Sequence, residues 1–300
     1  MRLEVKELWR YPVKSMRGES LTTANVTKGG IAFDRGWAVR DEGARTIRGA
    51  KFLGELMQCS ARYLSEQPDD GYSVPHAIIT FPNGMEINTD DERIHTQLSE
   101  LVNRHVTLWP LQPASNEDHY RINTLETGDL TSEIRKMFAI KDDEPLDLSQ
   151  FPPDLVRKLT TFVVPPGTYF DALPINVLTE ASIRHLQTLV PGVQLDVRRF
   201  RPNVLISDDA DTTGLLEETW LGKSVQIGEV DLSIVMRCPR CVMVTREQFE
   251  LKSEPSIMRS LVRHMGQCIS VYGQIEVGGA LQVGQSVVVD DTQTRSIQID

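Results

Sequence analysis

Residues 231–248 read DLSIVMRCPRCVMVTREQ and join a strand pattern to a chemically reactive motif. The apolar run at 232–236 is typical of a buried strand, and with SVQIGEV before it predicts a hairpin that turns at Gly228-Glu229. The strand pattern ends in the motif Cys-Pro-Arg-Cys at 238–241. Two cysteines at this spacing occur in redox pairs, in half of a zinc site, in a disulfide, or where one thiolate binds a metal. The rest of the chain has to distinguish these possibilities.

The surroundings of the two cysteines weaken three of these interpretations. A thioredoxin-type redox pair needs its first cysteine at a helix N-terminus. Cys238 instead follows a strand, and the β-branched run at 242–245 disfavours a helix. A structural zinc site needs four ligands, whereas Cys59 and Cys268 are isolated in the sequence and no second CxxC exists. Four cysteines in 300 residues are too few for a disulfide scaffold. Two buried structural cysteines, or one thiolate on a soft transition metal, remain open.

Composition indicates a globular chain with an acidic surface. The chain has 300 residues, of which 40% are hydrophobic and 25% are charged, and its formal net charge is −10. This charge repels nucleic acid and anionic lipid, so we expect neither as a partner. No run of eighteen apolar residues indicates a membrane span, and the N-terminal stretch alternates like a strand instead of resembling a secretory signal. We therefore expect a cytoplasmic protein with reduced thiols.

The pattern along the chain predicts two β-rich lobes with a few helices. A hairpin is expected around Asn83-Gly84, and the sequence LQVGQSVVV at 281–289 reads as another. Helices are expected at 91–103, at 180–190 with Thr179 as N-cap, and at 253–266 with Pro255 in the first turn. Periodicity fades between about 125 and 170, where an acidic, proline-bearing stretch is interpreted as an exposed connection. The predicted organisation is an N-terminal domain at 1–125, a connection at 126–170, a C-terminal domain at 171–291 and a tail at 292–300.

Basic residues gather in short stretches of this acidic chain. RRFRPNVLI at 198–206 contains three arginines and Asn203, Lys14-Ser15 follows a strand pattern, and Arg237 and Arg240 flank Cys238. Each could be a solvated surface charge. Together they predict an anion pocket, because lysine and arginine pair with phosphate oxygens, and the helix start at Thr179 is a natural phosphate seat. The residues thus predict a phosphorylated cofactor beside a reactive thiolate.

Six stretches in a fixed order carry a family resemblance. They are LWRYPVKSMRGESL (8–21), DRGWAV (34–39), VLTEASI (177–183), RRFRPNVLI (198–206), VMRCPRCVMVT (235–245) and GQCISVYGQI (266–275). The chain resembles the MOSC family, and most closely its two-part members, which include the mitochondrial amidoxime-reducing component and bacterial reductases of N-hydroxylated compounds. This resemblance implies an α+β, β-rich fold, in which a MOSC β-barrel domain follows a β-rich N-terminal domain.

The resemblance also implies a site that binds the molybdenum cofactor, Mo-molybdopterin. Cys241 would be the metal ligand and a catalytic residue. Glu247 occupies the position where relatives have an aspartate. It could deliver protons as a catalytic residue, or it could be a solvated residue at the end of a strand. The cofactor-binding residues implied by the resemblance and by the charges around the motif are Lys14, Ser15, Arg35, Thr179, Arg201, Asn203 and Arg240. Cys238 is expected to be a structural neighbour.

The implied activity is reduction of N-hydroxylated compounds, such as hydroxylamines and amidoximes, by oxygen-atom transfer to molybdenum held by Cys241. No ferredoxin-like cysteine cluster is present, so the electrons are expected from a separate flavin or iron–sulfur reductase. Two other hypotheses stay open. One is a non-redox carrier of sulfur or of the molybdenum cofactor, and the other is a thiol oxidoreductase that uses Cys238 and Cys241.

Overall fold

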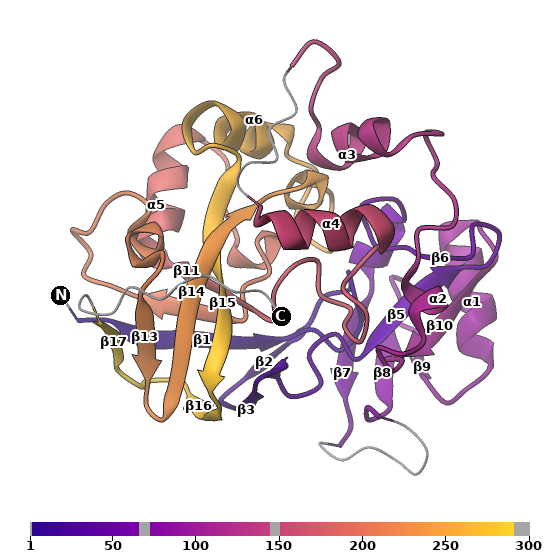
Figure 1. Cartoon of the computed structure of the whole chain (residues 1–300), viewed down its shortest axis with the longest axis horizontal. Helices are drawn as coiled ribbons and strands as arrows, with labels where there is room; N and C mark the ends of the chain where they lie inside the picture. The colour runs from indigo at the N-terminus through magenta and orange to yellow at the C-terminus, as the bar shows by residue number, and fades with distance from the viewer. Residues whose placement is uncertain (1, 66–72, 145–150, 291–300) are drawn as a thin grey trace.

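The computed structural model describes residues 2–65, 73–144 and 151–290 (Figure 1). Its largest element is a mixed eight-stranded sheet with the order β17-β13-β14-β15-β11-β12-β1-β2. In that order the strands are Val287–Asp290, Ser224–Ile227, Val230–Pro239, Cys268–Val277, Ile175–Thr179, Val204–Ser207, Glu4–Arg10 and Glu19–Leu21. Apolar residues of these strands, among them Leu8, Val177 and Ile234, form one continuous buried cluster. The predicted β-rich fold class is confirmed.

The predicted barrel is not closed by continuous strand pairing. The described strands at the two ends of the sheet, β17 and β2, do not pair. The two sides approach where the start of β1 meets the turn before β17, through an isolated bridge between Glu4 and Ser286 and a hydrogen bond from Val287 N to Leu3 O of 2.9 Å. In addition, Val5 N donates to Gln285 O at 2.9 Å and Val5 O accepts from Gly284 N at 2.8 Å, so a few backbone hydrogen bonds outside the strand ladders join the two sides.

Three smaller sheets complete the strands. One has the order β10-β5-β6 (Val106–Pro110, Trp37–Asp41, Thr46–Ile47), and a second has the order β7-β8-β9 (Ser60–Tyr63, Ala77–Thr80, Glu86–Asn88). The third has the order β16-β3-β4 (Gly279–Gln282, Thr23–Thr27, Gly30–Ile31). Helix α1 (Arg93–Val102) buries Ile94, Leu98 and Val102 against the core of the N-terminal strands. These residues recur every four positions and so lie on one face, as the sequence predicted for this helix.

Strand pairing crosses the predicted domain boundary. β1 pairs with β12 in an antiparallel register that places Leu8 opposite Val204, although about two hundred residues separate them in sequence. β16 pairs with β3, and β17 pairs with β13. The predicted hairpin at 281–289 was therefore wrong, because its two strands join different sheets. The division into domains at residue 125 stays a prediction, and the N-terminal strand lies in the sheet of the C-terminal half.

Local signals identified several helices and turns. The hairpins at Gly84 and Gly228 are present, and both glycines have positive φ angles. Helix α5 (Glu180–Leu189) begins after Thr179, whose hydroxyl accepts a hydrogen bond from Ser182 N, and α6 (Pro255–His264) begins at Pro255. The run Val242–Thr245, expected to disfavour a helix, forms the short 3-10 helix η4. Other 3-10 turns are η1 (Gly54–Gln58), η2 (Val197–Arg199) and η3 (Leu216–Trp220).

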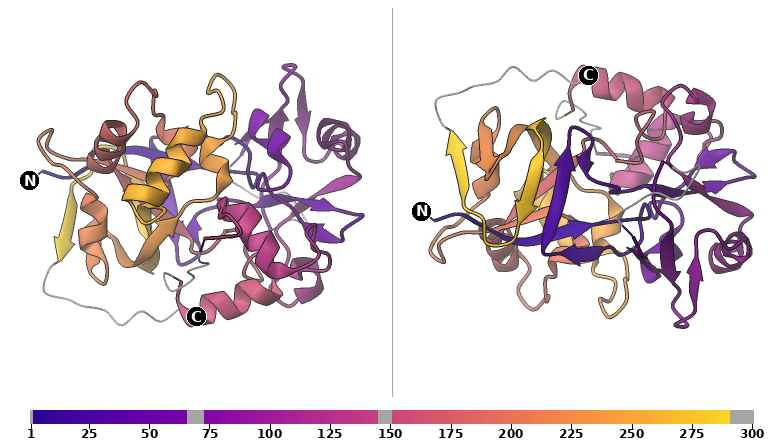
Figure 2. Two further views of the ribbon diagram at one scale, coloured as in Figure 1. Left: turned by 90° about the horizontal axis from the view of Figure 1, so that it is seen from above. Right: turned by 90° about the horizontal axis from the view of Figure 1, so that it is seen from below.

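The expected connection between the lobes contains helices. They are α3 (Leu130–Phe138) and α4 (Pro153–Thr161), and the short helix α2 (Glu117–Tyr120) precedes the connection. Residues 145–150 of the acidic stretch lie outside the described residues. Leu155 of α4 is fully buried against Val235 and Met236 of β14. Figure 1 shows α4 between the C-terminal sheet and the N-terminal strands, with α3 next to it, and the views of Figure 2 place both helices on the same side of the molecule. No helix in the described part of the chain has the length and hydrophobicity needed to cross a bilayer.

Candidate functional site

A cavity lies where the N-terminal strands, the C-terminal sheet and the connecting helices meet. Six of the nine residues predicted for the site line it, and they come from four separate stretches of the chain. They are Lys14, Ser15, Arg35, Arg201, Arg240 and Cys241. Among the described residues that line the cavity, six are lysine or arginine and two are acidic. A concentration of positive charge is thus present in a chain whose formal net charge is −10.

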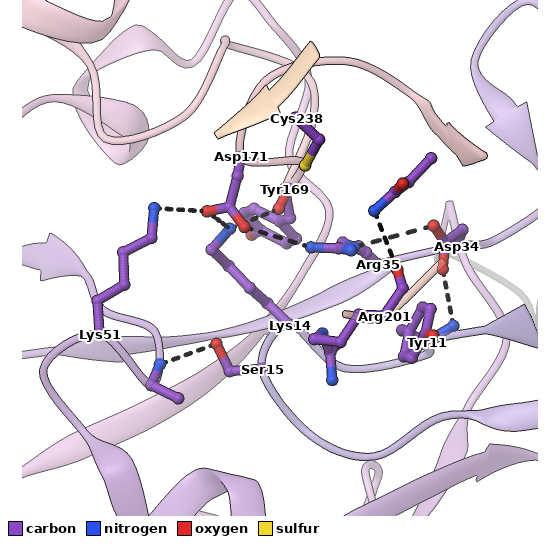
Figure 3. Close-up of polar contacts among 12 residues, drawn as sticks. Tyr11, Lys14, Ser15, Asp34, Arg35, Lys51, Tyr169, Asp171, Arg201 and Cys238 are labelled. Carbon is purple, nitrogen blue, oxygen red and sulfur yellow. Dashed lines mark hydrogen bonds and ion pairs between the residues drawn. The ribbon is translucent and has the colours of Figure 1, made fainter. Parts of the chain in front are cut away.

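Asp171 is the centre of the charge network in this cavity (Figure 3). Its Oδ1 accepts hydrogen bonds from Lys14 Nζ at 3.0 Å and Lys51 Nζ at 3.0 Å, and its Oδ2 accepts one from Arg35 Nη1 at 3.5 Å. Lys14 Nζ also donates to the carbonyl oxygen of Tyr169 at 2.8 Å. One carboxylate therefore gathers three cations that the sequence places far apart, and it occupies the position where an anionic group of a ligand would find the same donors.

Burial changes the acid–base properties of these groups. Burial lowers the pKa of Lys14 from 10.5 to about 8, against the opposing effect of Asp171. Burial likewise lowers the pKa of Arg201 to about 10, with the positive charge of Arg35 acting in the same direction. Although burial acts to raise the pKa of Asp171, the charges of Lys14, Lys51 and Arg35 hold it well below its usual range. Such closely packed cations favour binding of a further anion.

The backbone around the cavity is held in uncommon conformations. Ser15, Arg35 and Arg201 have φ angles of 73°, 53° and 50°, a left-handed region that non-glycine residues seldom adopt. Ser15 is fixed there by a hydrogen bond of 2.8 Å from Ala50 N to its hydroxyl oxygen. Gly49 packs against it so closely that an added Cβ would lie 2.7 Å from Ser15 Oγ. Backbone of this kind is concentrated at functional sites.

Several buried guanidinium nitrogens at the cavity lack hydrogen-bond partners among the described residues. Arg201 Nη2, Arg35 Nε and Arg240 Nε are buried and donate to no acceptor among the described residues. The nearest carboxylate to Arg35 Nε is that of Asp34, whose Oδ2 lies 3.9 Å away, beyond hydrogen-bond distance. The Arg201 guanidinium is otherwise well positioned, since Nη1 donates to Met16 O at 2.6 Å and its carbon lies 4.1 Å from the ring centre of Tyr11. Buried donors without acceptors are costly, so these nitrogens fit a site that takes an acceptor from a ligand.

The two cysteines of the motif have different environments. Cys238 is 1% exposed at the end of β14, and its sulfur accepts a hydrogen bond of 2.8 Å from Arg240 Nη1. Cys241 is half-buried, lines the cavity and precedes η4. Arg240 is thus fixed by Cys238 and by Phe200 O, to which Nη2 donates at 2.7 Å. Of the two, Cys241 is the thiol that a ligand in the cavity could reach.

Three predicted residues do not line the cavity formed by the described residues. Thr179 is fully buried and donates to Glu217 Oε2 at 2.6 Å. Asn203 lies behind the cavity, where Nδ2 donates to Asp34 Oδ2 at 2.9 Å and Oδ1 accepts from Asn176 N at 3.0 Å. Glu247 is exposed beyond η4.

Two further predicted features are placed differently from expectation. The helix start at Thr179 was expected as a phosphate seat, but the amide nitrogen of Ala181 donates to Asp208 at 2.8 Å, so a protein carboxylate holds it. Arg237, expected among the cations of the anion pocket, instead pairs with Glu218 at 2.8 Å and donates to Met265 O. Cys268 pairs across the sheet with Pro239, beside Cys238, and so is not isolated in the fold.

Sequence reasoning missed several polar residues of the cavity, among them Arg48, Lys51, Asp171 and Tyr272. Lys51 interacts electrostatically with Cys241. Burial acts to lower the pKa of Lys51, but the nearby Asp171 and Cys241 act to raise it, and the net result is a raised pKa. The run Arg48-Gly49-Ala50-Lys51 offered a signal, because a glycine between basic residues is typical of a close backbone approach to a ligand. Asp171 offered none, because an acid is not expected in an anion pocket.

Comparison with known proteins identifies the family. The chain matches the MOSC N-terminal beta barrel domain over residues 2–66 and the MOSC domain over residues 167–288. It therefore belongs to the MOSC family and has the two-part form, with the N-terminal domain preceding the MOSC domain.

The relatives of the chain include proteins of named function. Mitochondrial amidoxime reducing component 2 of Bos taurus is 27% identical over 312 residues, which cover 94% of this chain and 82% of the relative. Molybdenum cofactor sulfurase of Oryza sativa subsp. japonica is 24% identical over 82% of this chain but only 28% of the relative. Among solved structures, the YuaD protein of Bacillus subtilis aligns with 96% of each chain covered, at 12% identity and a TM-score of 0.42.

Proposed function

We propose that this protein is a molybdenum-cofactor-binding oxidoreductase that reduces N-hydroxylated compounds. The observation that carries the proposal is the single cavity that joins the accessible thiol of Cys241 to Lys14, Arg35 and Arg201. Membership of the MOSC family supports it, as do relatives named for amidoxime reduction and for the molybdenum cofactor. A soft thiolate suits a molybdenum centre, and grouped cations suit an anionic organic cofactor.

The residues of the cavity fit such a cofactor on chemical grounds. Lys14, Lys51 and Arg35 supply the positive charge that a phosphate requires. In the structure they donate to Asp171, so a bound phosphate would share these donors with Asp171 or replace it as their acceptor. Arg201 Nη2 supplies a buried donor that has no hydrogen-bond acceptor among the described residues. Cys241 would be the protein ligand of the metal. When bound, the cofactor supplies two-electron chemistry that removes oxygen from an N–O bond.

Reduction of a hydroxylamine or amidoxime consumes two electrons and two protons and releases water with the reduced nitrogen compound. The cavity offers Lys14 Nζ as a group that can hold a proton near neutral pH, because burial lowers its pKa to about 8. Glu247 is exposed outside the cavity, so it would act only through intervening water. The electrons would come from a separate flavin or iron–sulfur reductase.

Metal content and turnover together test this function. The full chain is produced in a host that makes the molybdenum cofactor, and molybdenum per protein is measured by mass spectrometry for the wild type, Cys241→Ser and the control Cys59→Ala. Cys59 is buried in the N-terminal core and has no place in the cavity. We expect Cys241→Ser to retain roughly a tenth of the metal or less, since the ligating thiolate is lost, and the control to match the wild type.

The same preparations are then assayed with acetamidoxime and a chemical reductant. Wild-type protein without molybdenum would contradict the proposal. Stoichiometric molybdenum without turnover, followed by transfer of the cofactor to an acceptor enzyme, would instead establish the non-redox carrier.

A further inference from the structure

The cavity continues beyond Cys241 into a region lined by apolar side chains. Two helices of the connecting segment contribute six of these side chains, which are Leu130, Ile134, Met137 and Phe138 of α3 and Val156 and Leu159 of α4. All six side chains are half-buried in the structure. The cavity therefore has a cationic end, where Lys14, Lys51 and Arg35 meet Asp171, and an apolar end walled by α3 and α4.

Helix α3 turns its apolar face towards the cavity. The four lining residues of α3 recur at positions i, i+4, i+7 and i+8, which is one side of a helix. In the described structure, none of them belongs to a buried core cluster. A helix normally buries its apolar stripe in the core of the protein, so a stripe that faces a cavity leaves surface available to a ligand.

Polar contacts at both ends hold α3 in this position. Glu133 is 3% exposed and pairs with Arg48 Nη1 at 3.0 Å, on the side of the N-terminal strands. At the other end, Gln267 Nε2 donates to Phe138 O at 3.0 Å and to Arg240 O at 3.0 Å. The apolar wall is therefore fixed relative to the Cys-Pro-Arg-Cys loop, as positioning of a substrate beside Cys241 requires.

We propose that α3 and α4 form a binding chamber for the hydrocarbon part of the substrate, and that Ile134 and Met137 determine specificity. This inference rests on the proposed function and deepens it. The substrate is an N-hydroxylated compound with a hydrocarbon chain or ring of several carbons. Its polar N–O end lies towards Cys241 and the cations, and its apolar end lies against α3, because only this orientation matches the two ends of the cavity.

Kinetics with an amidoxime series test the chamber. Acetamidoxime, butanamidoxime, hexanamidoxime and octanamidoxime are compared in the cofactor-loaded full chain with a chemical reductant. We expect kcat/KM to rise by about fourfold for each methylene that enters the chamber, and then to level off. Met137→Gln keeps the side-chain length and the helix propensity but places an amide in the chamber. It should lower kcat/KM for octanamidoxime by roughly tenfold or more and leave acetamidoxime within about twofold of the wild type.

The matched control is Thr131→Gln, which introduces the same side chain on the exposed face of α3. It should leave the dependence on chain length unchanged. Ile134→Gln provides a second variant in case Met137→Gln fails to fold, which circular dichroism and thermal unfolding would reveal.

A binding measurement separates this inference from the proposed function. Octanamide and acetamide, which lack the N–O bond, are titrated calorimetrically into wild-type protein, Met137→Gln and Thr131→Gln. Tighter binding of octanamide that is lost in Met137→Gln alone supports the chamber, even if no amidoxime is reduced and the proposed function fails. Turnover with the same kcat/KM for all four amidoximes, or equal binding of the two amides, overturns the chamber and leaves the reductase standing.

Discussion

Replacement of Lys14 by methionine should reveal the energetic cost of the cationic site. Lys14 is 4% exposed, and its ammonium donates hydrogen bonds to Tyr169 O and Asp171 Oδ1. Burial lowers its pKa from 10.5 to about 8. At about 1.4 kcal/mol for each pH unit, this lowering of the pKa means that the folded state disfavours the protonated form of Lys14 by about 3 kcal/mol.

The sign of the pH dependence follows from proton linkage. Between about pH 8 and pH 10.5 the unfolded chain keeps the proton on this lysine while the folded protein has released it, so the free energy of unfolding rises with pH in that window. Methionine has no proton to release. The free energy of unfolding of the wild type minus that of Lys14→Met should therefore increase by about 2–3 kcal/mol from about pH 7 to about pH 10.

Urea unfolding at a series of pH values measures this difference, with linear extrapolation to water. Subtraction of the two proteins cancels the titration of groups that both share. The control is Lys28→Met at an exposed lysine, for which the difference should stay constant. A difference between the wild type and Lys14→Met that is flat, or that falls with rising pH, would refute the assignment of Lys14 as a buried cation held at a cost in stability.

Two further predictions concern buried acids. Arg48→Met should lower the free energy of unfolding by about 3–5 kcal/mol, because Glu133 would keep a buried charge without its partner. The double variant Arg48→Met with Glu133→Gln should recover most of this loss. Urea unfolding of both variants measures the effect, and a loss below about 1 kcal/mol in the single variant would contradict the buried pair. Burial raises the pKa of Glu217 from 4.5 to about 7. The protonated carboxyl therefore contributes to the free energy of unfolding at low pH, and this stabilisation is lost as the pH rises through about 7. Glu217→Gln should remove that decline, and an unchanged pH profile of unfolding would contradict it.

Features that depend on a few adjacent residues were predictable from the sequence. The turns at Asn83-Gly84 and Gly228-Glu229, the cap at Thr179 and the helix start at Pro255 each follow from local backbone chemistry. Strand partners were less predictable, since the pairing of β1 with β12 joins residues about two hundred positions apart. A run of residues that alternates like a hairpin carries no information about which sheet each strand joins.

The candidate site was predictable as far as its residues have an evident affinity for anions or metals. Lys14, Arg35, Arg201 and Cys241 were found because their chemistry and the family resemblance agree, and they line one cavity. Asp171 was missed because its role depends on the cations around it and not on its own sequence context. The apolar wall of α3 was missed because a helix of nine residues gives too short a periodic pattern to stand out beside an acidic, proline-bearing stretch.

The cavity draws its lining from the first strands, the middle of the chain and the loop at Cys241. During synthesis, a nascent polypeptide that has emerged only as far as the connecting helices possesses Lys14 and Arg35 but lacks Arg201, Arg240 and the thiol. Capture of the proposed cofactor would then wait until nearly the whole polypeptide has left the ribosome and β1 has docked on β12. A molecule held in this cavity would also tie the early and late parts of the chain together, and its loss would loosen both.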